Sequence, residues 1–163
     1  MRVPFVHLAV GIAAQRSELL AAAARVLDSG RFAGGPEVDA FERDFARACE
    51  VAHAVAVRTG TDALLLALRA LGIRPGDEVI CPTHTFFATA EAIALAGARP
   101  VFCDVREHDL TIDPDAARRQ LSEHVRAIIP VHLYGLIADM AALPSSIRRL
   151  SQETSMAIAQ TTI

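Results

Sequence analysis

Residues 59–105 decide the fold of this chain, and they read TGTDALLLALRALGIRPGDEVICPTHTFFATAEAIALAGARPVFCDV. Residues 78–81 and 99–103 are short apolar segments typical of buried strands, and each lies beside a helical pattern, at 61–71 and 87–95. The helix at 61–71 is almost entirely apolar, so we expect it to be buried. Alternating strands and helices predict an α/β fold with a mostly parallel sheet, right-handed crossovers and helices on both faces.

The same patterns continue on either side of this block. Apolar residues recur at helical spacing over 15–27 and again over 36–48, where a proline stands at the first helical position. Residues 54–57 and 127–131 read as short apolar strands, and an Asp-Pro pair starts a more polar helix over 113–122. One domain with a buried core is therefore expected from the 163 residues.

Composition excludes several classes of function. The net charge is -3, 52% of residues are hydrophobic, and no basic stripe is present, so we expect neither nucleic acid nor a membrane as a partner. The N-terminal segment does not resemble a signal peptide, which favours the cytoplasm. Cys49, Cys81 and Cys103 are odd in number and are expected to be reduced core residues. Metal-ligand spacings and a GxGxxG fingerprint are missing, which argues against a metal centre or a nicotinamide enzyme.

Two turns in the opening stretch place hydroxyl side chains and free backbone N–H groups at a helix start. The first lies at 59–62 and the second at 83–87. A helix N-terminus carries about half a positive charge, so such a turn suits a phosphate-bearing ligand without any basic side chain. This matters here because all 16 basic residues are arginine and the chain has no lysine.

Eight short motifs follow one another in order along the chain. They are SGRF (29–32), GPEV (35–38), GTDAL (60–64), PGDEV (75–79), TFFAT (85–89), GARPVF (97–102), DP (113–114) and VHLYG (131–135). Through these motifs the chain resembles the DegT/DnrJ/EryC1/StrS family of pyridoxal-phosphate sugar aminotransferases, which belong to fold type I and the aspartate aminotransferase superfamily. The resemblance runs to about residue 140 and implies an incomplete large domain of that fold.

The resemblance also implies a cofactor site. Gly60, Thr61 and Asp62 would hold the phosphate of pyridoxal 5'-phosphate through backbone amides and the Thr61 hydroxyl, with Asp62 contributing its N–H because its carboxylate would repel the phosphate. Phe86 would lie against the pyridine ring. The alternatives are that Thr61 only caps a core helix and that Phe86 is a core residue.

Three other residues near these turns have open roles. His84 is expected to face solvent, since its position varies in the family that the chain resembles. His132 and Tyr134 follow a strand at the edge where parallel sheets bind ligands, so they would either line the substrate side or serve the structure.

The implied activity is transfer of an amino group from an amino acid, typically glutamate, to a nucleotide-linked keto sugar, in a homo-oligomer with active sites at the dimer interface. This chemistry needs a lysine for the Schiff base and a carboxylate beside the pyridine nitrogen. The chain has no lysine, and the family's acid strand, which follows a segment like 138–140, is missing. We therefore assign no catalytic residue and expect the chain alone to be inactive.

The predicted organisation follows from this departure. Residues 1–141 are assigned to the N-terminal part of the cofactor-binding large domain and 142–163 to a divergent tail, with the small C-terminal domain absent. A truncated reading frame, a frameshift or a partial gene would each explain the change. The alternatives to a truncated aminotransferase are a non-catalytic module that pairs with a full-length homologue, a non-functional remnant, and a family member that uses histidine for dehydration.

Overall fold

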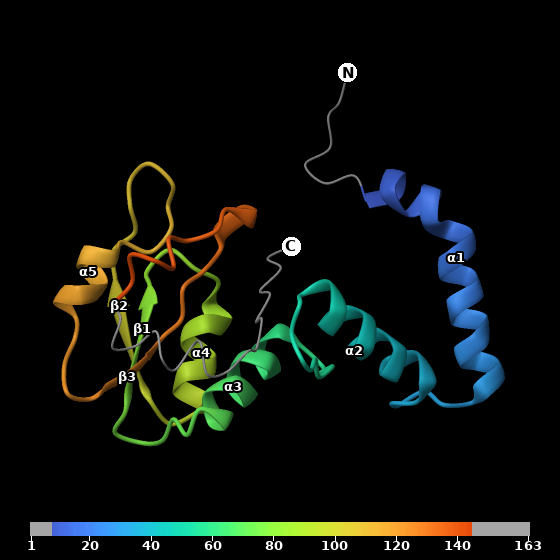
Figure 1. Ribbon diagram of the computed structural model, residues 1–163, viewed down its shortest axis with the longest axis horizontal. Coiled ribbons are helices and arrows are strands. Elements are labelled where there is room, and N and C mark those ends of the chain that lie inside the picture. Colours follow the sequence, from blue (N-terminus) through green and yellow to red (C-terminus); the bar gives the residue numbers. More distant parts are fainter. Residues whose placement is uncertain (1–7, 145–163) are drawn as a thin grey trace.

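A computed structural model describes residues 8–144. Two helices, α1 (Leu8–Ser29) and α2 (Pro36–Ala48), extend to one side of an α/β unit (Figure 1). This unit contains α3 (Gly60–Ala70), β1 (Glu78–Pro82), α4 (Phe87–Leu95), β2 (Arg99–Cys103), α5 (Pro114–Arg119), β3 (Val125–Ile128) and the short 3-10 helix η1 (Leu133–Gly135).

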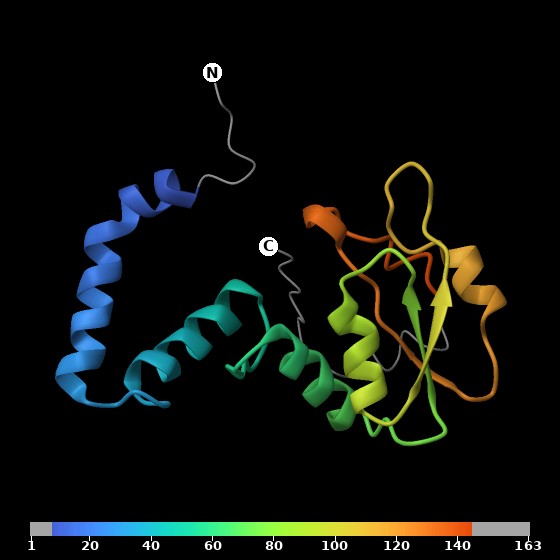
Figure 2. The same ribbon diagram turned by 180° about the vertical axis from the view of Figure 1, so that it is seen from behind.

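The α/β prediction is confirmed, because the strands form a parallel sheet with helices on both faces. The strand order is β2-β1-β3, so β1 is the central strand, and Ile80 on β1 pairs with both Val101 and Ile128. Figures 1 and 2 show α3 and α4 on one face of the sheet and α5 on the other. The sheet thus has the layered arrangement expected of an α/β protein.

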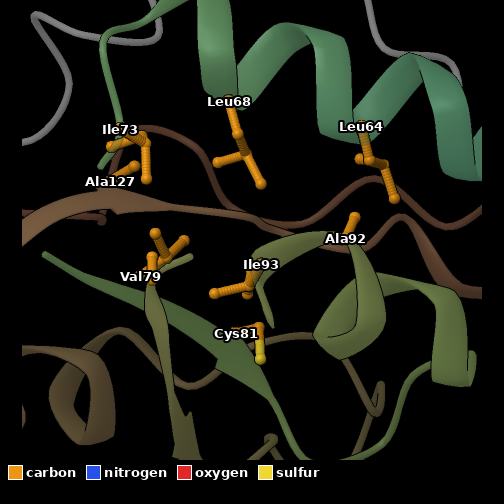
Figure 3. Packing of buried hydrophobic residues seen from close by; sticks show 9 residues of the cluster. Leu64, Leu68, Ile73, Val79, Cys81, Ala92, Ile93 and Ala127 are labelled. Carbon is orange, nitrogen blue, oxygen red and sulfur yellow. The ribbon is translucent and has the colours of Figure 1, made fainter. Parts of the chain in front are cut away.

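Alternation along β1 divides the core into two halves, because successive side chains of a strand point to opposite faces. Val79 and Cys81 point toward α3 and α4, where Figure 3 shows them packed against side chains of both helices. The buried members of this half are Leu64, Leu68, Ile73, Val79, Cys81, Ala92, Ile93, Ala98 and Ala127.

The second half of the core lies beneath α5. Ile80 points into it from β1 and packs with residues of β2, of α5 and of the chain after η1. Its buried members are Ile80, Val101, Cys103, Ile112, Ala116, Ala117, Ala138 and Leu143. Leu143 belongs to the segment assigned to a divergent tail, so the start of that segment is part of the core. The rest of the tail lies outside the described residues, and its divergence stays a prediction.

The strand predicted at 54–57 is wrong. These residues form no strand, and Val55 is 77% exposed. The backbone N–H of Ala56 donates instead to Glu42 Oε1 on α2, at 2.7 Å. An apolar, β-branched run has the composition of a strand, but it becomes one only where a neighbouring strand accepts its hydrogen bonds. None of the described strands lies beside it.

Further details of burial and of element bounds differ from the prediction. The helix predicted at 61–71 buries one face only, since Leu64 and Leu68 are buried while Leu66 is 49% exposed. The last strand covers Val125–Ile128 rather than 127–131, because Pro130 has no N–H to donate to the sheet. The polar helix predicted over 113–122 ends at Arg119.

The cysteines are free, as expected. Cys81 and Cys103 are buried, and Cys49 is partly buried. Burial raises the pKa of the Cys81 thiol to about 12 and that of Cys103 to about 11. Both thiols stay protonated at neutral pH, so they act as small core side chains rather than nucleophiles.

The helix α1 makes few contacts with the rest of the described chain. Leu19, Leu20 and Leu27 on this helix are exposed, and an ion pair joins Arg25 to Glu37 of α2 at 2.7 Å. Within residues 8–144, no helix combines the length and apolar character needed to cross a membrane.

The first prediction concerns the core beneath α3 and α4. Ile93 is fully buried there, so Ile93→Ala is expected to lower the free energy of unfolding by about 3 kcal/mol through lost burial and a cavity. Leu66→Ala, on the exposed face of α3, should cost about 1 kcal/mol or less. Urea unfolding followed by circular dichroism measures both values. Equal losses would show that α3 and α4 do not pack on the sheet as described.

An ion network joins the amino ends of the three strands. Glu78 on β1 bonds to Arg99 on β2, and the Ser122 hydroxyl donates to Glu78 Oε2 at 2.9 Å from the loop before β3. Asp77 Oδ1 lies 3.5 Å from Arg126 Nε on β3. The hydrogen bond from Arg99, and then the one from Ser122, hold the pKa of Glu78 below its ordinary value.

The second prediction is an acid dependence of stability. A carboxyl whose pKa is lowered by folding stabilises the protein above its ordinary value of about 4.5, and this contribution is lost as the pH falls through the lower folded pKa. The free energy of unfolding should therefore fall in acid, and the fall should be shallower in Glu78→Gln. Glu18→Gln, on the exposed surface of α1, is the control and should keep the wild-type slope. A wild-type slope in Glu78→Gln would exclude the network as its source.

Candidate functional site

The first turn of α3 is a helix start with free backbone donors. Thr59 is the N-cap, with an extended backbone, and its Oγ1 accepts the Asp62 N–H at 3.0 Å. Its carbonyl accepts the Ala63 N–H, also at 3.0 Å. The N–H groups of Gly60 and Thr61 come before the first intrahelical bond and have no assigned acceptor within residues 8–144. These two amides are available to an external anion.

Asp62 takes a different part from the one expected of its backbone. The family resemblance implies that the Asp62 N–H faces the phosphate, but this N–H donates to the Thr59 hydroxyl instead. Its carboxylate lies 3.4 Å from Arg58 Nε, in an ion pair between residues four positions apart. Arg58 precedes the N-cap Thr59, so this pair joins the segment before α3 to the first turn of the helix.

The space around these donors is open. A Cβ built on Gly60 would meet no other atom within 4 Å, and Thr61 is only partly buried. The Thr61 hydroxyl has no assigned partner in the described part of the chain, so it does not cap the helix. Thr59 is the cap, which removes the simplest structural explanation for Thr61.

Phe86 stands at the start of α4, directly after the loop that leaves β1. It is the N-cap residue, and no side-chain bond caps this helix. Its ring is 62% exposed, so Phe86 is not a core residue. A hydrogen bond between the hydroxyls of Thr85 and Thr89, at 2.9 Å, holds the turn on either side of it. The phenyl ring of Phe86 is therefore exposed to solvent at the start of α4.

The helices α3 and α4 begin at the same end of the sheet. A Cβ built on Gly97, which has φ +85°, would lie 3.0 Å from Pro75 Cγ, so the loops that follow the two helices touch. The helices have 11 and 9 residues, which corresponds to lengths of about 16 and 14 Å. Their starts therefore lie toward the carboxyl ends of the strands, the edge at which open α/β sheets bind ligands.

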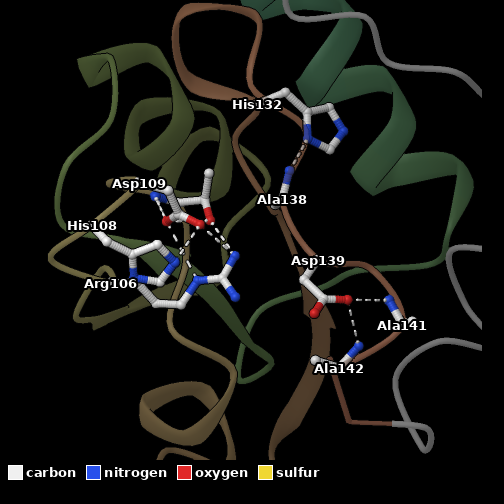
Figure 4. A network of polar contacts seen from close by, with 9 residues as sticks. Arg106, His108, Asp109, His132, Ala138, Asp139, Ala141 and Ala142 are labelled. Carbon is white, nitrogen blue, oxygen red and sulfur yellow. Dashed lines mark hydrogen bonds and ion pairs between the residues drawn. The ribbon is translucent and has the colours of Figure 1, made fainter.

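The loop after β3 reaches the same edge, and the structure separates its two candidate residues. His132 Nδ1 accepts the Ala138 N–H at 3.1 Å, as Figure 4 shows, so its imidazole has a structural role. Tyr134 has a left-handed backbone, with φ 53°, and is 81% exposed. Its ring is therefore free to meet a ligand. His84 is exposed, as expected.

A second polar cluster beyond β2 was missed by sequence reasoning. Asp109 accepts bonds from the Thr111 N–H and hydroxyl, both at 2.9 Å, and pairs with Arg106 at 2.6 Å (Figure 4). Partial burial pulls the pKa of Asp109 upward, but the bonds from Thr111 and Arg106 outweigh it and hold the pKa below its ordinary value. The Asp109 carboxylate makes these bonds to residues of its own loop, so the cluster is structural.

The donor set fits one part of a pyridoxal-phosphate site. Two free amides and a hydroxyl at a helix N-terminus suit a phosphate dianion, and an exposed phenyl ring suits a flat aromatic ligand. The covalent part does not fit, because the chain has no lysine.

Comparison with known proteins assigns the class of protein and then the family. Solved structures that resemble this chain are pyridoxal-phosphate aminotransferases of fold type I, and the chain has part of their fold. The chain belongs to the DegT/DnrJ/EryC1/StrS aminotransferase family, whose model matches residues 13–160. That match extends into the segment assigned to a divergent tail.

Individual relatives agree with this assignment. The chain is 51% identical over 142 residues to dTDP-3-amino-3,4,6-trideoxy-alpha-D-glucose transaminase of Streptomyces venezuelae, covering 87% of this chain and 38% of the relative. The crystal structure of S. venezuelae DesV matches 93% of this chain and 40% of its own, with a TM-score of 0.85 and 49% identity. NtdA of Bacillus subtilis, with bound cofactor PMP, matches 93% of this chain and 34% of its own, with a TM-score of 0.83 and 33% identity. The chain therefore spans about two fifths of the length of this transaminase and of DesV.

The third prediction separates the cap from the ligand-facing residue. Thr59→Ala removes the side-chain acceptor of α3 and should lower the free energy of unfolding by about 1 kcal/mol. Thr61→Val keeps the shape of the side chain and removes a hydroxyl with no assigned partner, so it should change stability by less than about 0.5 kcal/mol. Thermal and urea unfolding measure both. A larger loss in Thr61→Val than in Thr59→Ala would reverse the two roles.

Proposed function

We propose that this chain forms the phosphate-binding and ring-facing part of the pyridoxal 5'-phosphate site of a nucleotide-sugar aminotransferase. The observation that carries the proposal is the first turn of α3, where the N–H groups of Gly60 and Thr61 and the Thr61 hydroxyl have no assigned partner within residues 8–144. A relative whose name describes a sugar transaminase is 51% identical to this chain over 142 residues, which supports the same site here.

Each residue has a distinct part in this proposal. The N–H groups of Gly60 and Thr61 donate to the phosphate, and the Thr61 hydroxyl adds a third donor. Asp62 holds the turn through its N–H bond to Thr59, and Phe86 presents its ring to the pyridine. When bound, pyridoxal phosphate supplies an electron-accepting ring for amino-group transfer.

The complete reaction needs groups beyond this chain. We propose transfer from an amino-acid donor to a nucleotide-linked keto sugar, in a homo-oligomer, with a lysine supplied by residues other than these 163 because none of them is lysine. Residues 1–141 then represent the N-terminal part of the cofactor-binding large domain. By itself the chain binds and orients the cofactor without covalent attachment through a lysine.

A second candidate function is a non-catalytic module that pairs with a full-length homologue. The observation that favours it is the apolar surface of α1, where Leu19, Leu20 and Leu27 are exposed. A helix of this length gains most of its stability from packing, so a partner would stabilise it. Co-expression with a lysine-bearing homologue tests the second candidate, which requires a stable complex with that homologue and fails if none forms.

The fourth prediction tests the cofactor site with pyridoxamine 5'-phosphate, because this form cannot react with the N-terminal amine. The full chain should bind it more tightly than pyridoxamine in equilibrium dialysis. Thr61→Val should weaken binding of the phosphate form by about tenfold and leave pyridoxamine unchanged. Phe86→Ala should weaken both ligands by about fivefold.

Phe32→Ala is the matched control for Phe86, because Phe32 is also exposed but lies between α1 and α2. It should bind both ligands as the wild type does. If the folded wild type fails to distinguish the phosphate form from pyridoxamine, or if Thr61→Val has no effect, the proposed site is wrong.

A further inference from the structure

We infer that Arg58 is a positioning residue for the cofactor phosphate, which it serves by neutralising the carboxylate of Asp62. The inference rests on the proposed function, since it concerns the same first turn of α3. It assigns a role to a side chain outside the set of residues proposed to touch the cofactor.

Geometry places the two charges beside the free amides. Asp62 is the third residue of α3, and its carboxylate lies on the first turn, which also carries the N–H groups of Gly60 and Thr61. Arg58 Nε lies 3.4 Å from Asp62 Oδ2, and the side chains are 87% and 33% exposed. The carboxylate thus has a cationic neighbour, and the guanidinium is open to solvent.

Helix stability does not explain this pair. A cation that precedes a helix N-terminus opposes the helix dipole, whereas Asp62 alone would favour it. The pair also lacks the support that pairs four residues apart give within a helix, because Arg58 precedes the N-cap Thr59 and lies outside α3. The Arg58 guanidinium therefore places a positive charge where it does little to stabilise the helix.

A phosphate ligand changes this balance. Bound at the two amides, it would bring about two negative charges close to the Asp62 carboxylate, and their repulsion would weaken binding. With the guanidinium paired to Asp62, the first turn presents amide donors and no net charge. In a chain without lysine, an arginine has to provide this neutralisation.

The test is a double-mutant cycle on the full chain, with binding of pyridoxamine 5'-phosphate as the readout and pyridoxamine as the ligand without phosphate. Arg58→Gln should weaken binding of the phosphate form by about three- to tenfold at low salt, and by less than about twofold in 0.5 M salt. Asp62→Asn should bind as well as the wild type or better. The double variant should return to within about twofold of the wild type, and pyridoxamine binding should not change.

Arg69→Gln is the matched control, because it removes the same charge from the last turn of α3 and should leave binding unchanged. Circular dichroism and urea midpoints check that each variant is folded. Wild-type affinity in Arg58→Gln would overturn the inference. So would a loss that persists in the double variant, because Arg58 would then contact the phosphate directly.

The failure of the inference differs from the failure of the proposed function. If Thr61→Val weakens binding and Arg58→Gln does not, the site stands and only the role of Arg58 is rejected. If the wild type does not prefer the phosphate form, the site is rejected and the inference with it.

Discussion

The structure depends on the burial of β1 between two strands and two layers of helices. Val79, Ile80 and Cys81 are fully buried, and β1 pairs in parallel with β2 on one side and β3 on the other. Removing this apolar surface from water is the largest favourable contribution that so small a sheet can make. Because successive side chains point to opposite faces, the same three residues hold α3 and α4 on one side and α5 on the other.

This central strand also determines where ligand chemistry can occur. A parallel sheet requires each crossover helix to run back against the strands, so the helices begin at the carboxyl edge. The exposed ring of Phe86 lies toward that edge as a consequence, because α4 joins β1 to β2. The free amides of α3 lie toward the same edge because the loops that follow α3 and α4 touch at the other end. The ion network around Glu78 lies at the opposite edge, where it joins the strands. The proposed binding site and the ion network that joins the strands therefore lie at opposite ends of the sheet.

The proposed site contains only some of the groups that the family's chemistry needs. In the proposed site, the described residues would supply phosphate donors and a ring surface, which are backbone and apolar features that follow from helix starts and exposure. The proton-transferring amine is a side-chain property, and no residue of this chain carries it. The proposed phosphate site does not depend on the lysine, because helix geometry, rather than any particular side chain, would create most of it.

Periodicity and turn chemistry allowed most elements to be predicted from the sequence. The helix over Phe87–Leu95 and the strand over Arg99–Cys103 have the expected bounds, because their neighbours in sequence are also their neighbours in space. The strand predicted at 54–57 failed because a strand needs a partner, and apolar composition does not specify one. Helix burial was overestimated for a related reason, since an apolar residue such as Leu66 is buried only if another element covers it.

The sequence by itself determined the α/β class, the family and the absence of a lysine, because local patterns and residue identity are sufficient for each of them. Only the tertiary structure decided which threonine caps α3, which side chain pairs with Asp62, and that His132 is held by the Ala138 amide. Those outcomes depend on distances between atoms. Several polar groups compete for the same partner there, and folded geometry selects which of them reaches it.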